Sequence, residues 1–288
     1  MIYRMLAMDI DGTLLNHNGR LNKESKAAIE YAQSKGIHVT LVTNRNFSTS
    51  KRLAKALKIE GYIVTHSGAY IASKLEKPLF VNKINEDITY EVVNFLERFN
   101  VQIAIVHEKF TVMNQRETDS SMLGKISWQR DSKLFYGKHY VESLSDHLVE
   151  KPVATPKIEV AFSTNEEAEE AGLALNGMYD EVECIHRGEG KMDIVAKGVS
   201  KLRGLLYLCE RLGITREQVV MVGSKIDDIS LMECCGLGVA MGNAPKEVKE
   251  AADWITRTEA QNGVQYMVKE LFRKQHPIDF LKKMNVIK

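Results

Sequence analysis

Short apolar runs alternate with helix-like segments along much of this chain, and this alternation limits the possible folds more than any other feature. Residues 4–10, 37–43, 61–65 and 219–223 are nearly continuous apolar runs that end in polar residues or glycine. Such runs are typical of strands buried on both faces of a parallel sheet. The segments between them, such as NKESKAAIEYAQSKG, have apolar residues at helical spacing and end in glycine. The alternation predicts an α/β fold with a doubly wound parallel sheet.

The pattern changes in the middle of the chain. Within residues 84–191, VQIAIVHEKFTVMN predicts two strands about a tight turn, and a strand, a helix and a strand follow from KIEVAFS to EVECIHR. After this block the alternation of strand and helix resumes. We therefore expect residues 1–83 and 192–288 to form one core, with residues 84–191 inserted into it as a smaller α+β domain.

Bulk composition excludes several classes of function. The 288 residues are 44% hydrophobic, which is enough for the core of two domains. Lysine and arginine total 39 against 38 acids, so no overall field favours nucleic acid or an anionic membrane as a partner. No apolar stretch approaches the roughly 20 residues that span a bilayer, and the N-terminus lacks the pattern of a signal peptide. With four cysteines in no paired spacing, we expect a cytoplasmic protein.

Two acids, Asp9 and Asp11, directly follow the first apolar run in MDIDGTLL. In an open parallel sheet the ligand lies beyond the carboxyl ends of the strands, where these side chains would emerge. A spacing of two residues directs both to one face if the strand geometry continues. The alternative is an Asx-turn, in which one aspartate only accepts hydrogen bonds from the backbone.

Several segments together resemble a known family. DIDGTLL resembles the nucleophile motif of the haloacid dehalogenase superfamily of phosphotransferases, and LVTNRN, IVAKGVSKLRGL and GLGVAMGNAPKEVKEAADWIT resemble its later motifs. Nearly the whole chain is similar to the Cof-type branch of that superfamily. The resemblance implies a Rossmann-like core with an inserted cap that selects the substrate.

The resemblance also implies roles for four residues. Asp9 would attack phosphorus and form an aspartyl-phosphate, and Asp11 would exchange protons with the leaving group and with water. Thr43 would hydrogen-bond the phosphoryl group, and Lys201 would neutralise its charge together with Mg²⁺. Thr43 is equally suited to cap the helix expected from Phe47.

The segment VVMVGSKIDDISLM departs from the family pattern. The family usually has Gly-Asp-x-x-Asn-Asp there, and this chain has Ser224 for the first acid and Asp227 for the asparagine. A serine hydroxyl is neutral, and hard divalent cations favour anionic oxygens, so weaker metal binding is expected. The two aspartates also suit the start of a helix. The expected metal ligands are Asp9, Asp11, Ser224, Asp227 and Asp228.

Further residues lie in loops where a substrate would bind. In HSGAYI the family commonly has Asn-Gly-Ala, whereas a general strand-end turn explains the segment equally well. Arginine suits phosphate but also covers surfaces, and polar residues are common at hinges in any case. The expected substrate-binding residues are Gly12, Asn44, Arg45, Ser67, Gly68, Arg187 and Asn243.

The resulting expectation is a Mg²⁺-dependent phosphatase that hydrolyses a small phosphate ester, such as a sugar phosphate or a cofactor phosphate. The alternative is a protein with the same fold that binds phosphate or regulates but turns over little substrate. Ser224 supports the alternative. The residues that support the enzyme are Asp9, Asp11, Thr43 and Lys201.

Overall fold

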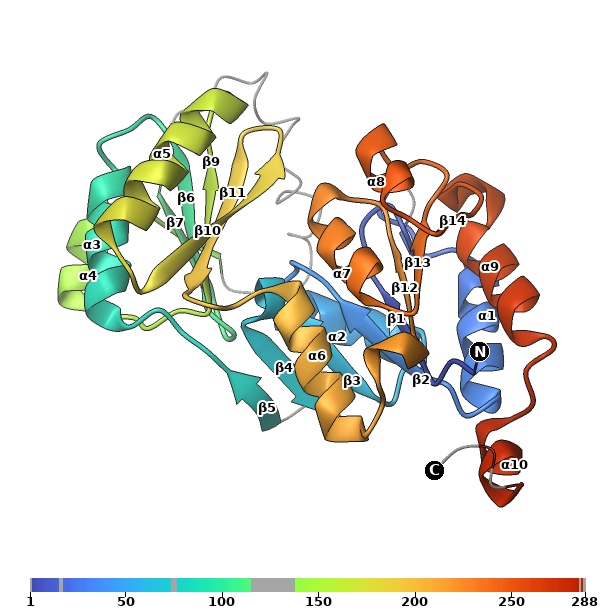
Figure 1. Ribbon diagram of the computed structural model, residues 1–288. Coiled ribbons are helices and arrows are strands. Elements are labelled where there is room, and N and C mark those ends of the chain that lie inside the picture. The colour runs from blue at the N-terminus through green and yellow to red at the C-terminus, as the bar shows by residue number, and fades with distance from the viewer. Residues whose placement is uncertain (1, 16–17, 74–76, 115–137, 285, 287–288) are drawn as a thin grey trace. The chain divides into compact units, whose positions relative to one another are not determined.

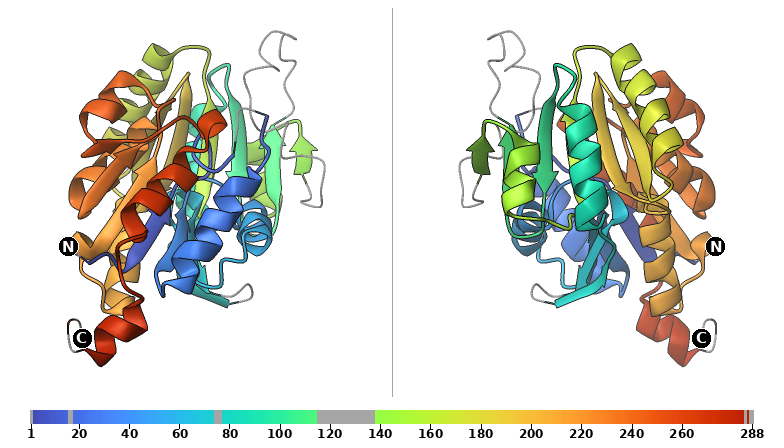
Figure 2. Two further views of the ribbon diagram at one scale, coloured as in Figure 1. Left: turned by 90° about the vertical axis from the view of Figure 1, so that its right-hand side faces the viewer. Right: turned by 90° about the vertical axis from the view of Figure 1, so that its left-hand side faces the viewer.

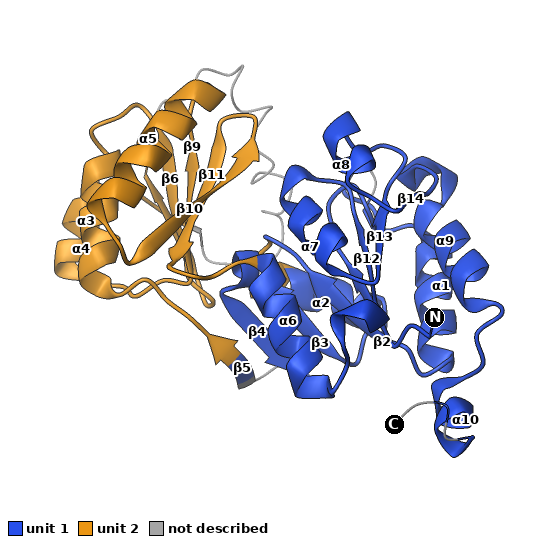
Figure 3. Ribbon diagram, viewed as in Figure 1, with its two compact units in different colours: residues 1–44, 50–79, 201–288 blue, residues 45–49, 80–200 orange. Residues whose placement is uncertain are grey.

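The computed structural model describes residues 2–15, 18–73, 77–114, 138–284 and 286 (Figure 1). The described chain divides into two compact units, residues 1–44, 50–79 and 201–288 in the first and residues 45–49 and 80–200 in the second (Figure 3). Residues 115–137, which belong to the block expected to form the cap, lie outside the described residues.

The first unit is built on a mostly parallel sheet. Strands β14, β13, β12, β1, β2, β3, β4 and β5 follow one another across it. Their pairings are parallel from β14 to β3, and β4 is antiparallel to β3. Every residue of β1 and β12 is buried, as the continuous apolar runs predict. The α/β fold class is therefore confirmed. The strands are β1 (Met5–Met8), β2 (His38–Val42), β3 (Tyr62–Thr65), β4 (Tyr70–Ser73), β5 (Lys77–Val81), β12 (Val219–Gly223), β13 (Leu237–Ala240) and β14 (Trp254–Ile255).

Helices cover both faces of this sheet (Figures 1 and 2). Helix α1 packs against α9 on one face, and α6 packs against α7 on the other. Asn22 caps α1, because its side chain accepts a hydrogen bond from the Glu24 N–H. The helices are α1 (Lys23–Ser34), α2 (Phe47–Ala56), α6 (Lys201–Leu212), α7 (Ile229–Cys234), α8 (Lys246–Glu250), α9 (Gly263–Phe272) and α10 (Ile278–Lys283). No helix of the described chain is long and apolar enough to cross a membrane.

The second unit contains its own sheet, in the order β10, β11, β9, β6, β7 and β8. Strands β6 and β7 form the expected antiparallel pair, with Ala104 opposite Met113. The strands are β6 (Gln102–Val106), β7 (Thr111–Asn114), β8 (Lys138–Val141), β9 (Lys157–Ala161), β10 (Val182–Gly188) and β11 (Lys191–Ala196), and the helices are α3 (Glu86–Leu96), α4 (Leu144–Glu150) and α5 (Asn165–Met178).

Both predicted boundaries of the second unit differ from those in the structure. A core that resumes at residue 192 would take in most of β11, but this strand pairs antiparallel with both β9 and β10. The second unit accordingly continues to Ser200, and it begins at Phe80 rather than at residue 84. The sequence could not place this boundary, because a central strand of either sheet has the same apolar composition.

Candidate active site

The cluster of polar side chains in the first unit lies at the carboxyl ends of three neighbouring strands. Strand β1 pairs with β2 on one side and with β12 on the other, so Met8 lies opposite both Leu41 and Val222. The residues that follow these strands, Asp9, Thr43 and Ser224, are therefore brought to one edge of the sheet, where open α/β sheets bind ligands. All three are buried.

Asp9 is fixed by its backbone and keeps one carboxylate oxygen without a hydrogen bond. Its N–H donates to the Val222 carbonyl at 2.9 Å, which continues the strand pairing. The residue is 1% exposed, and its Oδ1 lies 3.6 Å from Lys201 Nζ. Oδ2 is buried and has no hydrogen-bond partner. A buried carboxylate oxygen without a partner is costly, so this atom is suited to receive a ligand.

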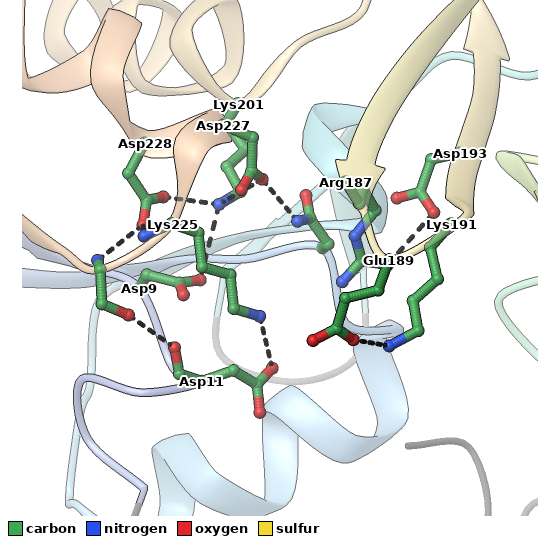
Figure 4. Close-up of polar contacts among 12 residues, drawn as sticks. Asp9, Asp11, Arg187, Glu189, Lys191, Asp193, Lys201, Lys225, Asp227 and Asp228 are labelled. Carbon is green, nitrogen blue, oxygen red and sulfur yellow. Dashed lines mark hydrogen bonds and ion pairs between the residues drawn. The ribbon is translucent and has the colours of Figure 1, made fainter. Parts of the chain in front are cut away.

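Lys201, the first residue of α6, is the buried cation of the cluster (Figure 4). Its Nζ lies 2.7 Å from Asp228 Oδ1 and 2.8 Å from Asp227 Oδ2. Burial lowers the pKa of this ammonium, but the carboxylates of Asp227, Asp228 and Asp9 outweigh burial and raise the pKa of Lys201 well above its usual value. Lys201 is therefore charged, and its charge holds these three carboxylates together.

Asp228 is held by donors from two directions. Its Oδ2 accepts hydrogen bonds from the N–H groups of Ser224 and Lys225 at 3.0 and 3.1 Å, and Oδ1 accepts from Lys201. Burial raises the pKa of Asp228 to about 7, although Lys201 lowers it. The ionised form therefore depends on these three donors. Gly223 makes this arrangement possible, because a Cβ at that position would lie 2.4 Å from Asp228 Oδ2.

Asp227 contacts Lys201 and an asparagine from another strand end. Asn44, two residues after β2, donates its Nδ2 hydrogen to Asp227 Oδ2 at 2.6 Å. The same oxygen faces Lys201. The carboxylate at position 227 thus connects the β2 end with the start of α6.

Ser224 connects the loop after β12 to the loop after β1. Its hydroxyl donates to the backbone carbonyl of Asp11 at 3.0 Å. Gly12 has a φ of +76°, and a Cβ there would lie 2.6 Å from Ser224 Oγ, so glycine is needed for both reasons. Asn243 donates to the Gly12 carbonyl at 2.8 Å and accepts from the Glu259 N–H at 3.1 Å. Asn243 therefore holds the loop after β1.

Ser67 and Gly68 lie beside Thr43. The Ser67 N–H donates to the Thr43 carbonyl at 3.3 Å, so the ends of β2 and β3 meet. Ser67 has a φ of 59° and Gly68 a φ of 105°. The positive φ at a serine marks strained backbone of the kind that occurs at binding sites.

The remaining predicted residues belong to the second unit. Arg45 lies in residues 45–49, which are grouped with that unit. Arg187 on β10 donates to Asp193 Oδ1 at 3.2 Å, and the other oxygen of Asp193 accepts from the buried Lys157 at 3.1 Å. Their contact with a substrate stays a prediction.

Oxygen atoms of Asp9, Asp11 and Ser224, together called the Asp11 corner, fit a hard divalent cation. The Asp9 carboxylate, the Asp11 carbonyl and Ser224 Oγ are oxygen donors of the kinds that Mg²⁺ favours. Among the described residues, however, no three histidine, cysteine or acidic side chains stand together as a ready metal site. Three of the acids lie around Lys201 Nζ, and position 224 carries a neutral serine.

Sequence reasoning gave no role to Lys225, although it lies between Ser224 and the two aspartates. Its Nζ is 3.8 Å from Asp11 Oδ2 (Figure 4). The signal was present in GSKIDD, where a lysine stands next to the position that usually carries the metal-binding acid.

Comparisons with known proteins agree with this geometry. The family model of haloacid dehalogenase-like hydrolases matches residues 6–268. The chain is 42% identical to the stress response protein YhaX of Bacillus subtilis (strain 168) over 286 residues, 99% of each chain. It is 30% identical to 5-amino-6-(5-phospho-D-ribitylamino)uracil phosphatase YcsE of the same organism, over 91% of this chain and 92% of that one. A solved haloacid dehalogenase-like hydrolase from B. subtilis superposes with a TM-score of 0.81 at 25% identity, covering 93% of this chain and 100% of that one.

The close approach of Gly223 to Asp228 gives a first prediction. Gly223→Ala should destabilise the protein by about 1–3 kcal/mol, because the added methyl group overlaps the Asp228 carboxylate. Gly177→Ala on α5 is the matched control, since a Cβ there meets nothing within 4 Å and alanine favours a helix by up to about 1 kcal/mol. Denaturant unfolding measures both. Equal stability of the two variants would contradict the close packing.

The charge of Lys201 gives a second prediction, in which pH matters. Lys201→Met leaves the buried carboxylates of Asp9 and Asp228 and the partly buried one of Asp227 uncompensated, and should cost about 3–5 kcal/mol at neutral pH. The raised pKa of Lys201 means that its contribution is present below its unfolded pKa and is lost as the pH rises through the folded pKa. In the variant the carboxylates should instead bind protons, so its stability should recover as the pH falls.

Unfolding free energies between pH 5 and pH 9 test this, with the exposed Lys246→Met as control. The gap between Lys201→Met and the parent should widen toward high pH within that range. A gap that does not depend on pH would show that Lys201 acts through packing instead of charge.

Proposed function

The chain belongs to the haloacid dehalogenase-like hydrolases, and from this premise we propose that it is a Mg²⁺-dependent phosphatase that works through an aspartyl-phosphate at Asp9. The observation that carries the proposal is the Asp9 carboxylate. It is buried at the carboxyl end of β1, beside the Lys201 ammonium, and its Oδ2 has no hydrogen-bond partner. Such an atom is suited to attack an electrophilic phosphorus.

In the first half of the reaction, Asp9 Oδ2 would form a bond to phosphorus while the bond from phosphorus to the ester oxygen breaks. The leaving oxygen would take a proton from the Asp11 carboxyl group. Asp11 is only partly buried, which suits contact with a leaving group that departs toward solvent. In the second half, water would attack the same phosphorus, Asp11 would take the water proton, and inorganic phosphate would leave Asp9.

The surrounding residues would stabilise charge and hold position. Lys201 would hold Asp9 and Asp228 in position by its charge, since it lies 3.6 Å from the first and 2.7 Å from the second. Thr43 and the Ser67 segment would contact the phosphoryl oxygens from the β2 and β3 ends. When bound, Mg²⁺ supplies positive charge that polarises the phosphoryl group. Asp9, the Asp11 carbonyl and Ser224 would hold it, and Asp228 would order its surroundings.

A small phosphorylated metabolite is the substrate that we propose. The name of the relative YcsE describes a phosphatase of a phosphorylated ribitylamino-uracil. This supports a sugar phosphate or a related cofactor precursor as the class, with the second unit acting as the cap that selects among them. Arg187, held by the buried Asp193, would be one of its polar contacts. The alternative, a phosphate-binding protein without turnover, has only Ser224 in its favour.

Hydrolysis of a general aryl phosphate tests the proposal. The parent protein with Mg²⁺ should turn over the ester, and Asp9→Asn should lose at least about a thousandfold, because the amide cannot act as the nucleophile. Chelation of the metal should reduce parent activity. Ser224→Asp should bind Mg²⁺ more tightly, since it adds an anionic oxygen at the Asp11 corner.

A covalent readout completes the test. Acid quenching of the parent during turnover should trap phosphate on Asp9, and mass spectrometry of the Asp9 peptide detects it. Parent activity no higher than that of Asp9→Asn, together with a gain in Ser224→Asp, would refute phosphatase function for the natural chain.

A further inference from the structure

Lys225 is a second cation at the site, and its backbone is fixed while its side chain remains accessible. The Lys225 N–H donates to Asp228 Oδ2 at 3.1 Å, which holds the residue in the loop after β12. Its side chain is 34% exposed, and Nζ lies 3.8 Å from Asp11 Oδ2. Figure 4 shows this ammonium reaching toward the Asp11 carboxylate, on the same side of the cluster as Asp9. A single, partly exposed ion pair at 3.8 Å is weak, so an incoming anion can replace the Asp11 carboxylate as the partner of Lys225.

Lys201 is poorly placed to meet the charge of a phosphate dianion alone. Its Nζ already contacts Asp228 and Asp227 at 2.7 and 2.8 Å, and the third carboxylate, Asp9, lies 3.6 Å away. Three carboxylates exceed the charge of one ammonium. A phosphoryl group that approaches Asp9 therefore needs positive charge from another source.

The Asp11 corner, with Ser224 at position 224, also binds a divalent cation less strongly than it would with an acid at that position. Ser224 is neutral, and its hydroxyl hydrogen is donated to the Asp11 carbonyl. The next residue, Lys225, adds a positive charge beside the same aspartate. Both features lower the affinity of this corner for Mg²⁺, and the second raises its affinity for an anion.

We propose that Lys225 is a phosphate-binding residue of this site, whose ammonium moves from Asp11 Oδ2 to the phosphoryl oxygens of the bound ester. The neutral Ser224 weakens metal binding, so a metal ion supplies less positive charge here. The Lys225 ammonium supplies part of that positive charge instead. This inference rests on the proposed function, because it assumes that the group held at Asp9 is a phosphate. It assigns Lys225 a role in binding and leaves the nucleophile and the proton donor unchanged.

Calorimetric titration with inorganic phosphate tests the proposal without turnover. Measurements with a chelator and with Mg²⁺ compare the parent, Lys225→Met, Lys225→Arg and the exposed control Lys246→Met. With the chelator, Lys225→Met should bind phosphate about tenfold more weakly or worse, which is the usual effect of losing one charge-assisted hydrogen bond. Lys225→Arg should stay within about threefold of the parent, since it keeps the charge. Lys246→Met should match the parent.

A second titration, with Mg²⁺ alone, provides an independent readout. Lys225→Met should bind Mg²⁺ more tightly than the parent, because it removes a cation beside the metal-binding oxygens. Tighter Mg²⁺ binding together with weaker phosphate binding is the expected pattern. A residue that only supports the fold would weaken both, and its arginine variant would not restore phosphate binding.

Three outcomes overturn the inference: phosphate binding by Lys225→Met equal to that of the parent, equal losses in the methionine and arginine variants, or no phosphate binding by the parent. Each leaves the aryl phosphate assay to decide the proposed function. Conversely, phosphate binding that depends on Lys225 in a protein that does not hydrolyse esters would refute the phosphatase and keep the inference.

Discussion

The buried Lys201 ammonium is the interaction on which the rest of the site depends. A cation at the first residue of a helix is disfavoured by the helix dipole, and burial disfavours it further. Both costs are offset only because Asp9, Asp227 and Asp228 surround it. These residues come from the end of β1 and from the loop after β12, so one charge joins three segments that are distant in sequence. The nucleophile candidate is therefore oriented by the same contact that fixes the helix.

Glycines allow these charged groups to approach the backbone. Gly223 leaves room for the Asp228 carboxylate, which then accepts hydrogen bonds from the two N–H groups that follow the strand. Gly12 leaves room for Ser224, whose hydroxyl reaches the Asp11 carbonyl. Any side chain at either glycine would displace an oxygen of the site. The loops after β1 and β12 are thus packed against each other through polar atoms, and the positions of Asp9, Asp11 and Asp228 are mutually dependent.

Much of the core could be predicted from the sequence, because its strands are continuous apolar runs and its acids follow them directly. The resemblance to the haloacid dehalogenase family was confirmed over residues 6–268. The end of the second unit could not be located, since the composition of β11 fits a central strand of either sheet. The partners of Asp227 could not be predicted from the sequence either. Its contact with Asn44 joins residues 183 positions apart, which local pattern cannot reveal. Lys225 received no role from the sequence motifs, and its place near the site follows from the 3.8 Å between its Nζ and Asp11 Oδ2.

An acid at position 227 instead of position 224 does not place negative charge at the Asp11 corner, where we propose that a metal ion binds. Asp227 keeps the formal charge of the segment, but its Oδ2 is held by Asn44 and Lys201 on the other side of the cluster. At position 224, a metal ion that bound the Asp11 carbonyl along the direction of the Ser224 hydroxyl would displace its hydrogen bond. One such bond is worth about 1 kcal/mol, or roughly a fivefold change in affinity. An aspartate there would lose no hydrogen bond and would add a charge. The negative charge of Asp227 therefore lies at Lys201 and not at the proposed metal site. More of the positive charge that a bound phosphate needs must then come from the protein.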